Sequence, residues 1–376
     1  SNVFEPVRNF KIDIPPGEWI VTQTISDAFY GLRWRSYILV RLENGKFSEA
    51  IKCLDSVIEI NPNHAQAHWD RSLTYLQSGD LKRGFVEYEW RWKLNDNPPR
   101  NFSKPLWDGE PLNGRTLLIH CEQGMGDSIQ FSRYINLLFG DSQNIILECQ
   151  PPLKRLFTSL KGPQNIIGRG CELPEFDFHV PLLTLPKISG TTLETIPKMT
   201  PYLANTSEDY DYFNKIVTAP KDWLKVGLCW AGKPSQKNDL NRSCGLAPML
   251  ELVGTKNVMF YSLQVGQKVS ELDSLGASGL IKDLSPKLKD FGCTAGAIKN
   301  LDLVISVDTS VAHLAGALNI PLWIPLTFTG DWRYLCKKTT TEWYSSAKIF
   351  QQDVHGDWTN VFRKIKVGLE KLVDSK

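Results

Sequence analysis

The chain has 376 residues, more than one ordinary domain of about 150 residues, which predicts two or three units. Its 43 Lys and Arg residues face 41 Asp and Glu residues, a formal net charge of +2, so it lacks the excess positive charge that nucleic-acid binding usually needs. Hydrophobic residues at 42% and aromatic residues at 11% are enough for packed cores, which indicates a globular protein rather than a disordered one.

The apolar stretches are too short to cross a membrane. The longest, 301–307 and 320–326, fall far short of the ~20 residues that a span needs. Residues 1–10 mix charge with Pro and show no apolar core of a secretory signal. The eight cysteines have no zinc-site spacing. We therefore expect reduced thiols and a cytoplasmic protein.

A repeat with a period of 34 residues covers the N-terminal part, and both copies are typical of a helix, a tight turn and a second helix. The matching pairs are Leu39 and Leu73, Leu42 and Leu76, Gly45 and Gly79, Phe47 and Leu81, and Ala50 and Gly84. The last pair is small enough for two helices to cross closely. The pattern resembles about two tetratricopeptide repeats, which are too few to fold alone, so we expect a helical region over 1–100 that leans on the rest of the chain.

Short apolar runs alternate with helical stretches from Thr116 onward, the pattern of a parallel α/β sheet. A first series predicts strands at 116–121 and 145–149 and a helix at 127–139. A second series predicts strands at 226–230, 258–264, 303–307 and 322–326. The fold class is therefore α/β, with two Rossmann-like halves over 101–220 and 221–350 and a last helix over 358–372 whose apolar residues share one face.

The loop after the first strand, residues 122–127, contains Gly124, Gly126 and Asp127. Glycines let a ligand approach the backbone, and a helix start offers unpaired N–H groups. A dinucleotide-binding fingerprint would need glycine at position 129, which is Ile129, so NAD binding is disfavoured. Two interpretations of Asp127 stay open: a carboxylate presented to a ligand at the sheet edge, or a helix cap.

A second helix start follows the apolar strand at 303–307. Asp308, Thr309 and Ser310 offer caps and unpaired N–H groups, which suit a diphosphate, and His313 lies one turn further along. The alternative is a well-capped structural helix with a satisfied histidine.

A polar loop after the strand at 226–230 supplies two cations. Lys233 and Arg242 stand where they can meet phosphate oxygens, although loop cations are usually just solvated. Gln264, at the end of another strand, is a candidate contact to a nucleotide.

Two candidate metal sites are weak. Asp209 and Asp211 form an acidic pair, but they lie in a polar connector away from any strand end. His64 and His68 are spaced i, i+4 near a helix start without a third ligand. We interpret both pairs as structural and expect no metal site.

Several segments, in this order, resemble bacterial tetratricopeptide-repeat glycosyltransferases related to heptosyltransferases and, more distantly, to protein O-GlcNAc transferases. The segments are 88–92 (YEWRW), 107–110 (WDGE), 122–127 (EQGMGD), 226–232, 241–243 (NRS), 261–264 (YSLQ), 307–317 and 331–334 (DWRY). The resemblance covers nearly all of the chain from Gly31 onward.

The resemblance implies a GT-B fold, with a nucleotide sugar bound by the C-terminal half and the active site between the halves. Asp127 matches the residue proposed as base in heptosyltransferases, and Asp308, Thr309 and Ser310 match a helix start that meets donor phosphates. It also implies that the C-terminal segment 351–376 packs back on the first half.

The leading hypothesis is an inverting, metal-independent transferase for hexosyl or heptosyl groups that needs no cofactor beyond its nucleotide-sugar substrate. The acceptor is a glycan, a lipid-linked glycan or a protein, and the repeat helices are a possible surface for a protein partner. Two alternatives stay open: an interaction protein with a degenerate GT-B part, and a nucleotide-sugar epimerase or hydrolase on the same fold.

Overall fold

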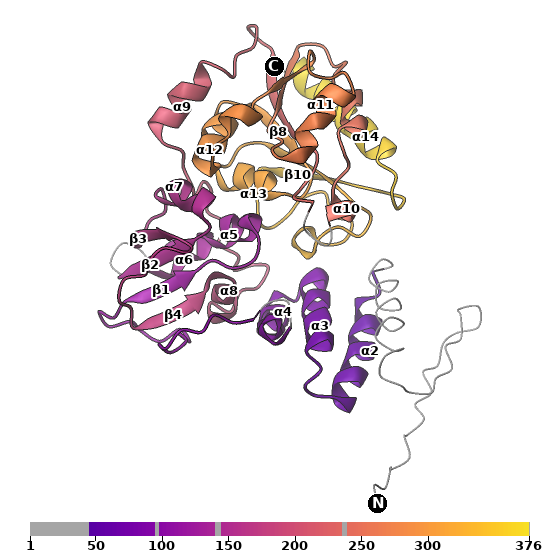
Figure 1. The fold of residues 1–376 in the computed structure, drawn as a ribbon. Helices are drawn as coiled ribbons and strands as arrows, with labels where there is room; N and C mark the ends of the chain where they lie inside the picture. The colour runs from indigo at the N-terminus through magenta and orange to yellow at the C-terminus, as the bar shows by residue number, and fades with distance from the viewer. Residues whose placement is uncertain (1–44, 95–97, 140–143, 235–238, 376) are drawn as a thin grey trace, which may run out of the picture.

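The computed structural model describes residues 45–94, 98–139, 144–234 and 239–375. They form a helical region (45–94), a first α/β half (98–203) and a second α/β half (204–375), and the helical region lies beside both halves (Figure 1). The first helix of the first repeat falls outside the described residues.

The helical region contains three α-helices and a 3-10 helix, which are α2 (Phe47–Ile60), α3 (Ala65–Ser78), α4 (Leu81–Glu87) and η1 (Tyr88–Lys93). Gly79 ends α3 with φ of 90°, a left-handed conformation that favours glycine. A Cβ at Gly84 would lie 2.6 Å from Cδ2 of Leu76, so the close crossing expected here is confirmed. That these helices are tetratricopeptide repeats stays a prediction.

The first half contains a four-stranded parallel sheet in the order β3-β2-β1-β4. Its strands are β1 (Leu117–His120), β2 (Ile145–Cys149), β3 (Pro163–Gly168) and β4 (Phe178–Pro181), and its helices are α5 (Met125–Phe131), α6 (Arg133–Phe139), η2 (Pro151–Leu153), α7 (Lys154–Phe157), η3 (Leu182–Thr184) and α8 (Leu185–Ile188). The two expected strands are present. The helix expected over 127–139 begins earlier and is divided at Ser132.

The second half contains a six-stranded parallel sheet in the order β10-β9-β8-β5-β6-β7. Its strands are β5 (Leu224–Cys229), β6 (Val258–Ser262), β7 (Ile281–Asp283), β8 (Leu303–Ser306), β9 (Leu322–Leu326) and β10 (Ala347–Gln351). Its helices are α9 (Ser207–Asn214), α10 (Asp239–Arg242), η4 (Ala247–Leu252), η5 (Gln267–Ser270), α11 (Glu271–Ser274), η6 (Ser285–Lys287), α12 (Phe291–Lys299), α13 (Ser310–Ala317), η7 (Trp332–Tyr334) and α14 (Thr359–Asp374).

One apolar core joins all three parts. It includes Phe85 of the helical region, Phe131 of the first half and Trp332 of the second half. The helical region therefore leans on both halves, as its short length requires. A second core lies on the other face of the six-stranded sheet.

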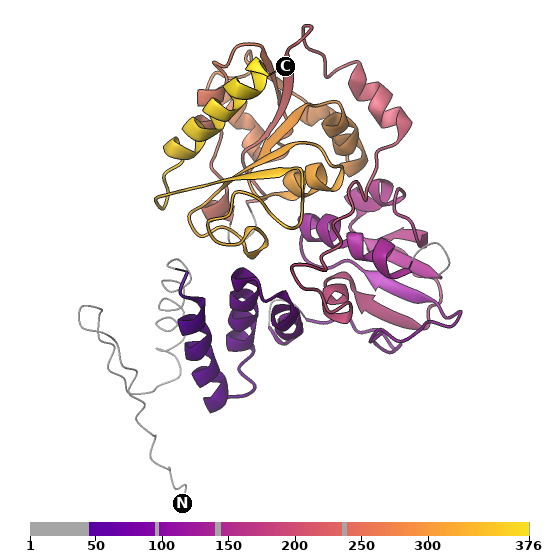
Figure 2. The ribbon, with the colours of Figure 1, turned by 180° about the vertical axis from the view of Figure 1, so that it is seen from behind.

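The C-terminal helix differs from the expectation that segment 351–376 packs back on the first half. The apolar face of α14, with Val361, Phe362 and Ile365, is buried in the second core, which consists of second-half residues. Figure 2 shows α14 against the sheet of its own half, away from the first half. The helices α12 and α13 cover only one face of that sheet. Because the other apolar face must also be buried, α14 packs there and not on the first half.

The connector helix α9 also lies with the second half, although we expected the first half to extend to residue 220. Asn300, which directly follows α12, donates from Nδ2 to the carbonyl of Tyr210 at 3.1 Å. A Cβ at Gly296 of α12 would lie 2.7 Å from Cβ of Asp209, so the two helices pack very closely. The boundary between the halves therefore precedes α9.

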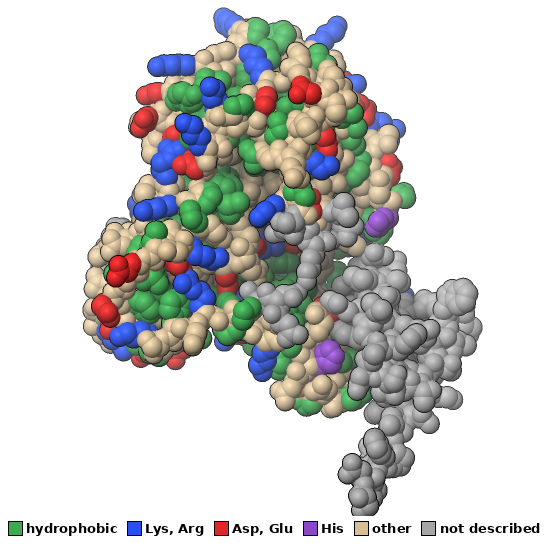
Figure 3. All heavy atoms as spheres, in the orientation of Figure 1, with side chains coloured by type: hydrophobic (Ala, Val, Ile, Leu, Met, Phe, Trp, Pro, Cys, Tyr) green, Lys and Arg blue, Asp and Glu red, His purple; other side chains and the backbone are tan. Residues whose placement is uncertain are grey.

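None of the described helices is long and apolar enough to cross a bilayer. Basic and acidic side chains are interspersed over the face drawn in Figure 3, in keeping with the near-zero balance of charge.

Candidate active site

The loop between β1 and α5 makes a sharp turn that is held by the helical region. Gln123 has φ of 55°, a left-handed conformation uncommon for a residue with a side chain. The hydroxyl of Tyr88 donates to Gln123 Oε1 at 3.1 Å, and Gln150 Nε2 donates to the Gln123 carbonyl at 3.2 Å. These bonds fix the turn that leads into α5 at Gly124.

Asp127 lies in the first turn of α5, and each of its two carboxylate oxygens has a partner. Oδ2 accepts from the backbone N–H of Gly124 at 3.0 Å, which is a capping bond. Oδ1 accepts from Nη2 of Arg333 at 2.5 Å. Burial raises the pKa of Asp127, against the opposing effects of Arg333 and the Gly124 N–H. The structure thus shows that Asp127 caps the helix and that its other oxygen faces the second half.

The start of α13 has no side-chain capping bond within the described part of the chain. The Thr309 hydroxyl bonds the Ser306 hydroxyl at 2.9 Å and makes no capping bond to the helix. Asp308 Oδ1 accepts from the Tyr334 hydroxyl at 2.8 Å. Ser310 follows as the first helical residue.

His313 is buried at this helix start and hydrogen-bonded through one ring nitrogen. Its Nδ1 lies 2.9 Å from the Tyr344 hydroxyl and its Nε2 lies 3.6 Å from Asp308 Oδ1. Burial lowers the pKa of His313 to about 3, so its imidazole is neutral at ordinary pH.

The starts of α5 and α13 are in contact. A Cβ at Gly126 would lie 2.8 Å from Cδ2 of His313 and 3.5 Å from Cα of Ser310. The structure therefore brings together seven of the expected site residues, and the contact explains why position 126 is glycine. The seven are Gly124, Gly126, Asp127, Asp308, Thr309, Ser310 and His313.

The loop after β5 places Lys233 and Arg242 differently. The Lys233 side chain is exposed, whereas Arg242 packs over Gly232 with Nε 3.3 Å from Asp239 Oδ1. Ser243 holds the same loop by accepting from the Gly232 N–H at 3.0 Å. Contact of either cation with phosphate stays a prediction.

Gln264 is turned inward. Its Oε1 accepts from the backbone N–H groups of Trp230 and Ala231, at 3.1 and 2.9 Å, and its Nε2 donates to two backbone carbonyls. This amide therefore shapes the loop after β5. A direct hydrogen bond from Gln264 to a nucleotide stays a prediction, and it would require one of these four contacts to break.

Two buried arginines, Arg333 and Arg91, were not among the expected site residues. Arg333 lies beside Asp127, and Arg91 of η1 pairs with Glu122 at 2.8 Å and Glu89 at 2.5 Å. Burial raises the pKa of Glu122 to about 7, and its Oε2 has no hydrogen-bond partner among the described residues. Both arginines lie in segments rich in Trp and Tyr, YEWRW and DWRY, a signal that was visible without a structure.

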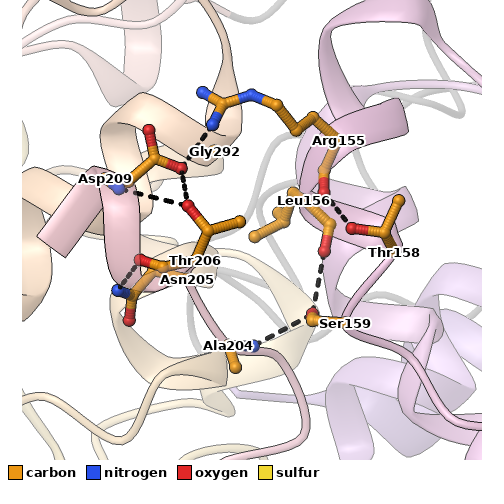
Figure 4. Close-up of a pocket in the computed structure, with 9 residues that line it drawn as sticks. All are labelled: Arg155, Leu156, Thr158, Ser159, Ala204, Asn205, Thr206, Asp209 and Gly292. Atoms are coloured by element: carbon orange, nitrogen blue, oxygen red, sulfur yellow. Dashed lines mark hydrogen bonds and ion pairs between the residues drawn. The ribbon is translucent and has the colours of Figure 1, made fainter.

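Three of the four residues interpreted as structural, His64, His68 and Asp209, have protein partners. His68 Nδ1 lies 2.9 Å from Glu87 Oε2 and its ring stacks on Trp90 at 3.6 Å. His64 accepts from the Ala67 N–H at the start of α3. Asp209 accepts from Arg155 and from the Thr206 hydroxyl (Figure 4). In the described ranges, no group of three His, Cys, Asp or Glu residues could hold a metal ion.

Two hollows lie away from Asp127. The smaller, of about 210 Å³, is bounded by Arg155 of α7 and by Asp209 and Gly292 of the second half (Figure 4). Arg155 also pairs with Asp290 at 2.6 Å, so it joins the two halves. The larger hollow, of about 1080 Å³, lies between β10 and α14.

Comparison with known proteins shows the fold. No protein-family model matches the chain. Protein FlbA of Caulobacter vibrioides is 25% identical over 343 residues, which cover 83% of this chain and 56% of FlbA, so the chain spans about half the length of that relative.

A glycosyl transferase family 9 structure from Veillonella parvula matches with a TM-score of 0.51 and 9% identity, over 72% of this chain and 100% of that one. An ADP-heptose LPS heptosyltransferase II from E. coli matches with a TM-score of 0.49 and 12% identity, over 69% and 99%. The two parallel α/β halves and the family 9 match fit a GT-B-like fold.

Proposed function

We propose that this protein is a glycosyltransferase that moves a hexosyl or heptosyl group from a nucleotide sugar to an acceptor hydroxyl, with inversion and without a metal ion. The observation that supports this most strongly is the contact between the starts of α5 and α13, which sets the Asp127 carboxylate beside a helix N-terminus suited to a diphosphate. The GT-B-like fold agrees with this arrangement.

In the proposed reaction, Asp127 accepts the proton of the acceptor hydroxyl as its oxygen attacks the anomeric carbon. Attack opposite the departing nucleoside diphosphate inverts the configuration there. General-base assistance of this kind contributes about 10² to 10⁴-fold. The Asp127 carboxylate is held at both oxygens, yet each oxygen keeps a lone-pair site for the incoming proton.

The second half would stabilise the leaving group. The N–H groups at the start of α13 supply the field of a helix N-terminus, and Lys233 and Arg242 add charge from the neighbouring loop. The neutral His313 could form a hydrogen bond to the nucleotide sugar, but it cannot supply a positive charge at ordinary pH.

The test is a donor screen with product analysis. The protein is incubated with nucleotide sugars of different bases and sugars, and the released nucleoside diphosphate and the glycosylated acceptor are identified by mass spectrometry. Products that form without an acceptor would instead support a hydrolase or an epimerase.

A binding experiment covers the remaining alternative. A nucleoside diphosphate at 100 times its dissociation constant should raise the free energy of unfolding by about 2.7 kcal/mol. Failure of every nucleotide tested to stabilise the fold or to release a product would leave the interaction-protein alternative standing.

A further inference from the structure

Arg333 is a buried cation that joins the second half to the candidate base. It belongs to η7, is 8% exposed, and makes three side-chain contacts across the site. Nη2 donates to Asp127 Oδ1 at 2.5 Å, Nε donates to Gln130 Oε1 at 2.5 Å, and Nη1 donates to Asp331 Oδ1 at 2.8 Å.

We propose that Arg333 is the positioning residue for Asp127: it aims the carboxylate and keeps it ionised, so that the base is competent only while the segment 331–334 is seated on α5. This inference rests on the proposed function for its catalytic meaning. It adds a third element to the candidate site: besides the starts of α5 and α13, the site also needs Arg333 in contact with Asp127.

The geometry of the guanidinium supports an aiming role. Asp127 and Gln130 are three residues apart on α5, and the planar fork of Arg333 contacts both. The Gly124 N–H holds the other Asp127 oxygen, so the carboxylate is bonded at both ends and cannot rotate freely. An ammonium in place of the guanidinium could contact one of these partners but not match the fork.

The charges around Asp127 explain why a cation is needed. Three carboxyl groups lie close enough to disfavour its ionised form: Asp331 before η7, Asp308 before α13 and Glu122 before α5. Tyr88 of η1 also interacts with it, and the neutral His313 of α13 lies against Gly126, the residue next to it. Burial acts in the same direction as the carboxyl groups, and Arg333 opposes both.

The segment that carries Arg333 is seated against the helical region. Trp332 packs edge-on against Phe85 of α4 with ring centroids 5.8 Å apart, and it also lies 6.4 Å from the ring of Phe131 in α5. Gln77 of α3 donates to the carbonyl of Thr329 at 3.3 Å. Arg333 therefore reaches Asp127 from a segment that contacts all three parts of the chain.

The first experiment is a pH profile of kcat/KM for Arg333→Gln, Arg333→Lys and Asp331→Asn. Loss of the guanidinium should raise the pKa of Asp127, so the acid limb of the Arg333→Gln profile should move up by about 1 to 3 pH units, with turnover recovering at high pH. Arg333→Lys should restore part of the shift. Asp331→Asn removes a carboxyl group and should not move the limb upward. Arg83→Gln, an exposed arginine on α4, controls for the loss of one positive charge.

A second experiment needs no substrate. The pKa of Asp127 is raised in the folded state, so the wild type loses stability as pH rises through that pKa. Asp127→Asn has no such titration, and the difference in free energy of unfolding between the two proteins measures the effect. In the Arg333→Gln background this decline should extend to higher pH by a similar 1 to 3 units. If the wild type has no transferase activity, the proposed function fails, and this experiment alone decides whether Arg333 controls Asp127.

Two outcomes would overturn the inference. One is an acid limb and an unfolding profile that both stay in place in Arg333→Gln and in Arg333→Lys. The other is a uniform loss of turnover at every pH, equal in Arg333→Gln and Asp331→Asn, which would mark a structural contact only. If Arg333→Gln does not fold, the pH profile of kcat/KM and the pH profile of the free energy of unfolding are both compared between Arg333→Lys and the wild type.

Discussion

The imidazole of His313 fills the space that a side chain at Gly126 would need. A Cβ there would lie 2.8 Å from the ring, and the ring is 5% exposed and bonded to Tyr344, so it has little room to withdraw. The two halves are thus in contact at Gly126 and His313, beside the candidate base Asp127.

Gly126→Ala should therefore disturb the site. Overpacking of this kind typically costs about 1 to 3 kcal/mol of folding free energy, and separation of the helix starts should also lower turnover. Chemical unfolding and kcat measure the two effects. Gly254→Ala is the matched control, because a Cβ there would meet nothing within 4 Å. In the double variant with His313→Ala, the cost at position 126 should shrink. An undiminished cost would show that His313 is not the obstacle.

Asp127→Asn should separate the cap from the base. Asn caps a helix about as well as Asp, and Arg333 keeps Asp331 as a partner, so stability and donor binding should persist. Turnover should fall by at least about a hundredfold, because the amide cannot accept the proton. Steady-state kinetics at saturating donor and acceptor measure this. A variant that keeps more than roughly a tenth of wild-type turnover would rule out Asp127 as the base.

Arg242→Ala should weaken the binding of a nucleoside diphosphate. Charge-assisted contacts to phosphate contribute about 1.5 to 3 kcal/mol each, which corresponds to roughly 10 to 150-fold in affinity. Isothermal titration calorimetry measures the change. Arg363→Ala, on the exposed face of α14, should leave the affinity unaltered. Equal affinity in Arg242→Ala and the wild type would remove Arg242 from the donor site.

Glu122 should make stability depend on pH. Its folded-state pKa of about 7 lies above the unfolded value, so the stability that it contributes is fully present below the unfolded pKa and is lost as pH rises through about 7. Glu122→Gln removes this titration while it can still bond Arg91. Relative to the wild type, the variant should gain stability between pH 5 and 8, measured by urea unfolding. Parallel profiles for the two proteins would contradict the raised pKa.

Turnover should survive EDTA. The proposed mechanism stabilises the leaving diphosphate with helix N–H groups and two cations, and Asp209 is already bonded to Arg155 and Thr206. Assays with and without chelator, followed by added Mg²⁺ or Mn²⁺, test this. Activity that is lost on chelation and restored by the ion would overturn metal independence and direct attention back to Asp209 and Asp211.

The sequence predicts best what depends on chain-local patterns. Strand β9 is a continuous apolar run and β2 is interrupted only by Glu148, and the structure has both at the expected residues. β4 was missed because His179 and Pro181 interrupt its apolar pattern, although three of its four residues are buried. Asp127 and Asp308 could each be placed at the carboxyl edge of a parallel sheet, and the resemblance to GT-B glycosyltransferases implied that the two edges meet at one site.

Residues whose role depends on distant partners could not be placed in the same way. Arg333 lies in a 3-10 turn without periodic pattern and meets Asp127 only through the contact between the halves. Gln264 follows a strand just as a ligand-binding residue would, but four backbone groups of its neighbours occupy its amide. The packing of α14 was decided by an uncovered sheet face, which no local pattern reveals.

The bond from Tyr88 to Gln123 and the contact of Phe85 with Trp332 have a consequence for how such a protein can evolve. The helical region contacts the turn before Asp127 and the segment that carries Arg333. For this reason recombination cannot exchange the helical region as an independent module. A helical region taken from another protein would have to bring its own equivalents of Phe85, Tyr88 and Arg91. Inheritance of the three parts as one unit is therefore the expected evolutionary pattern.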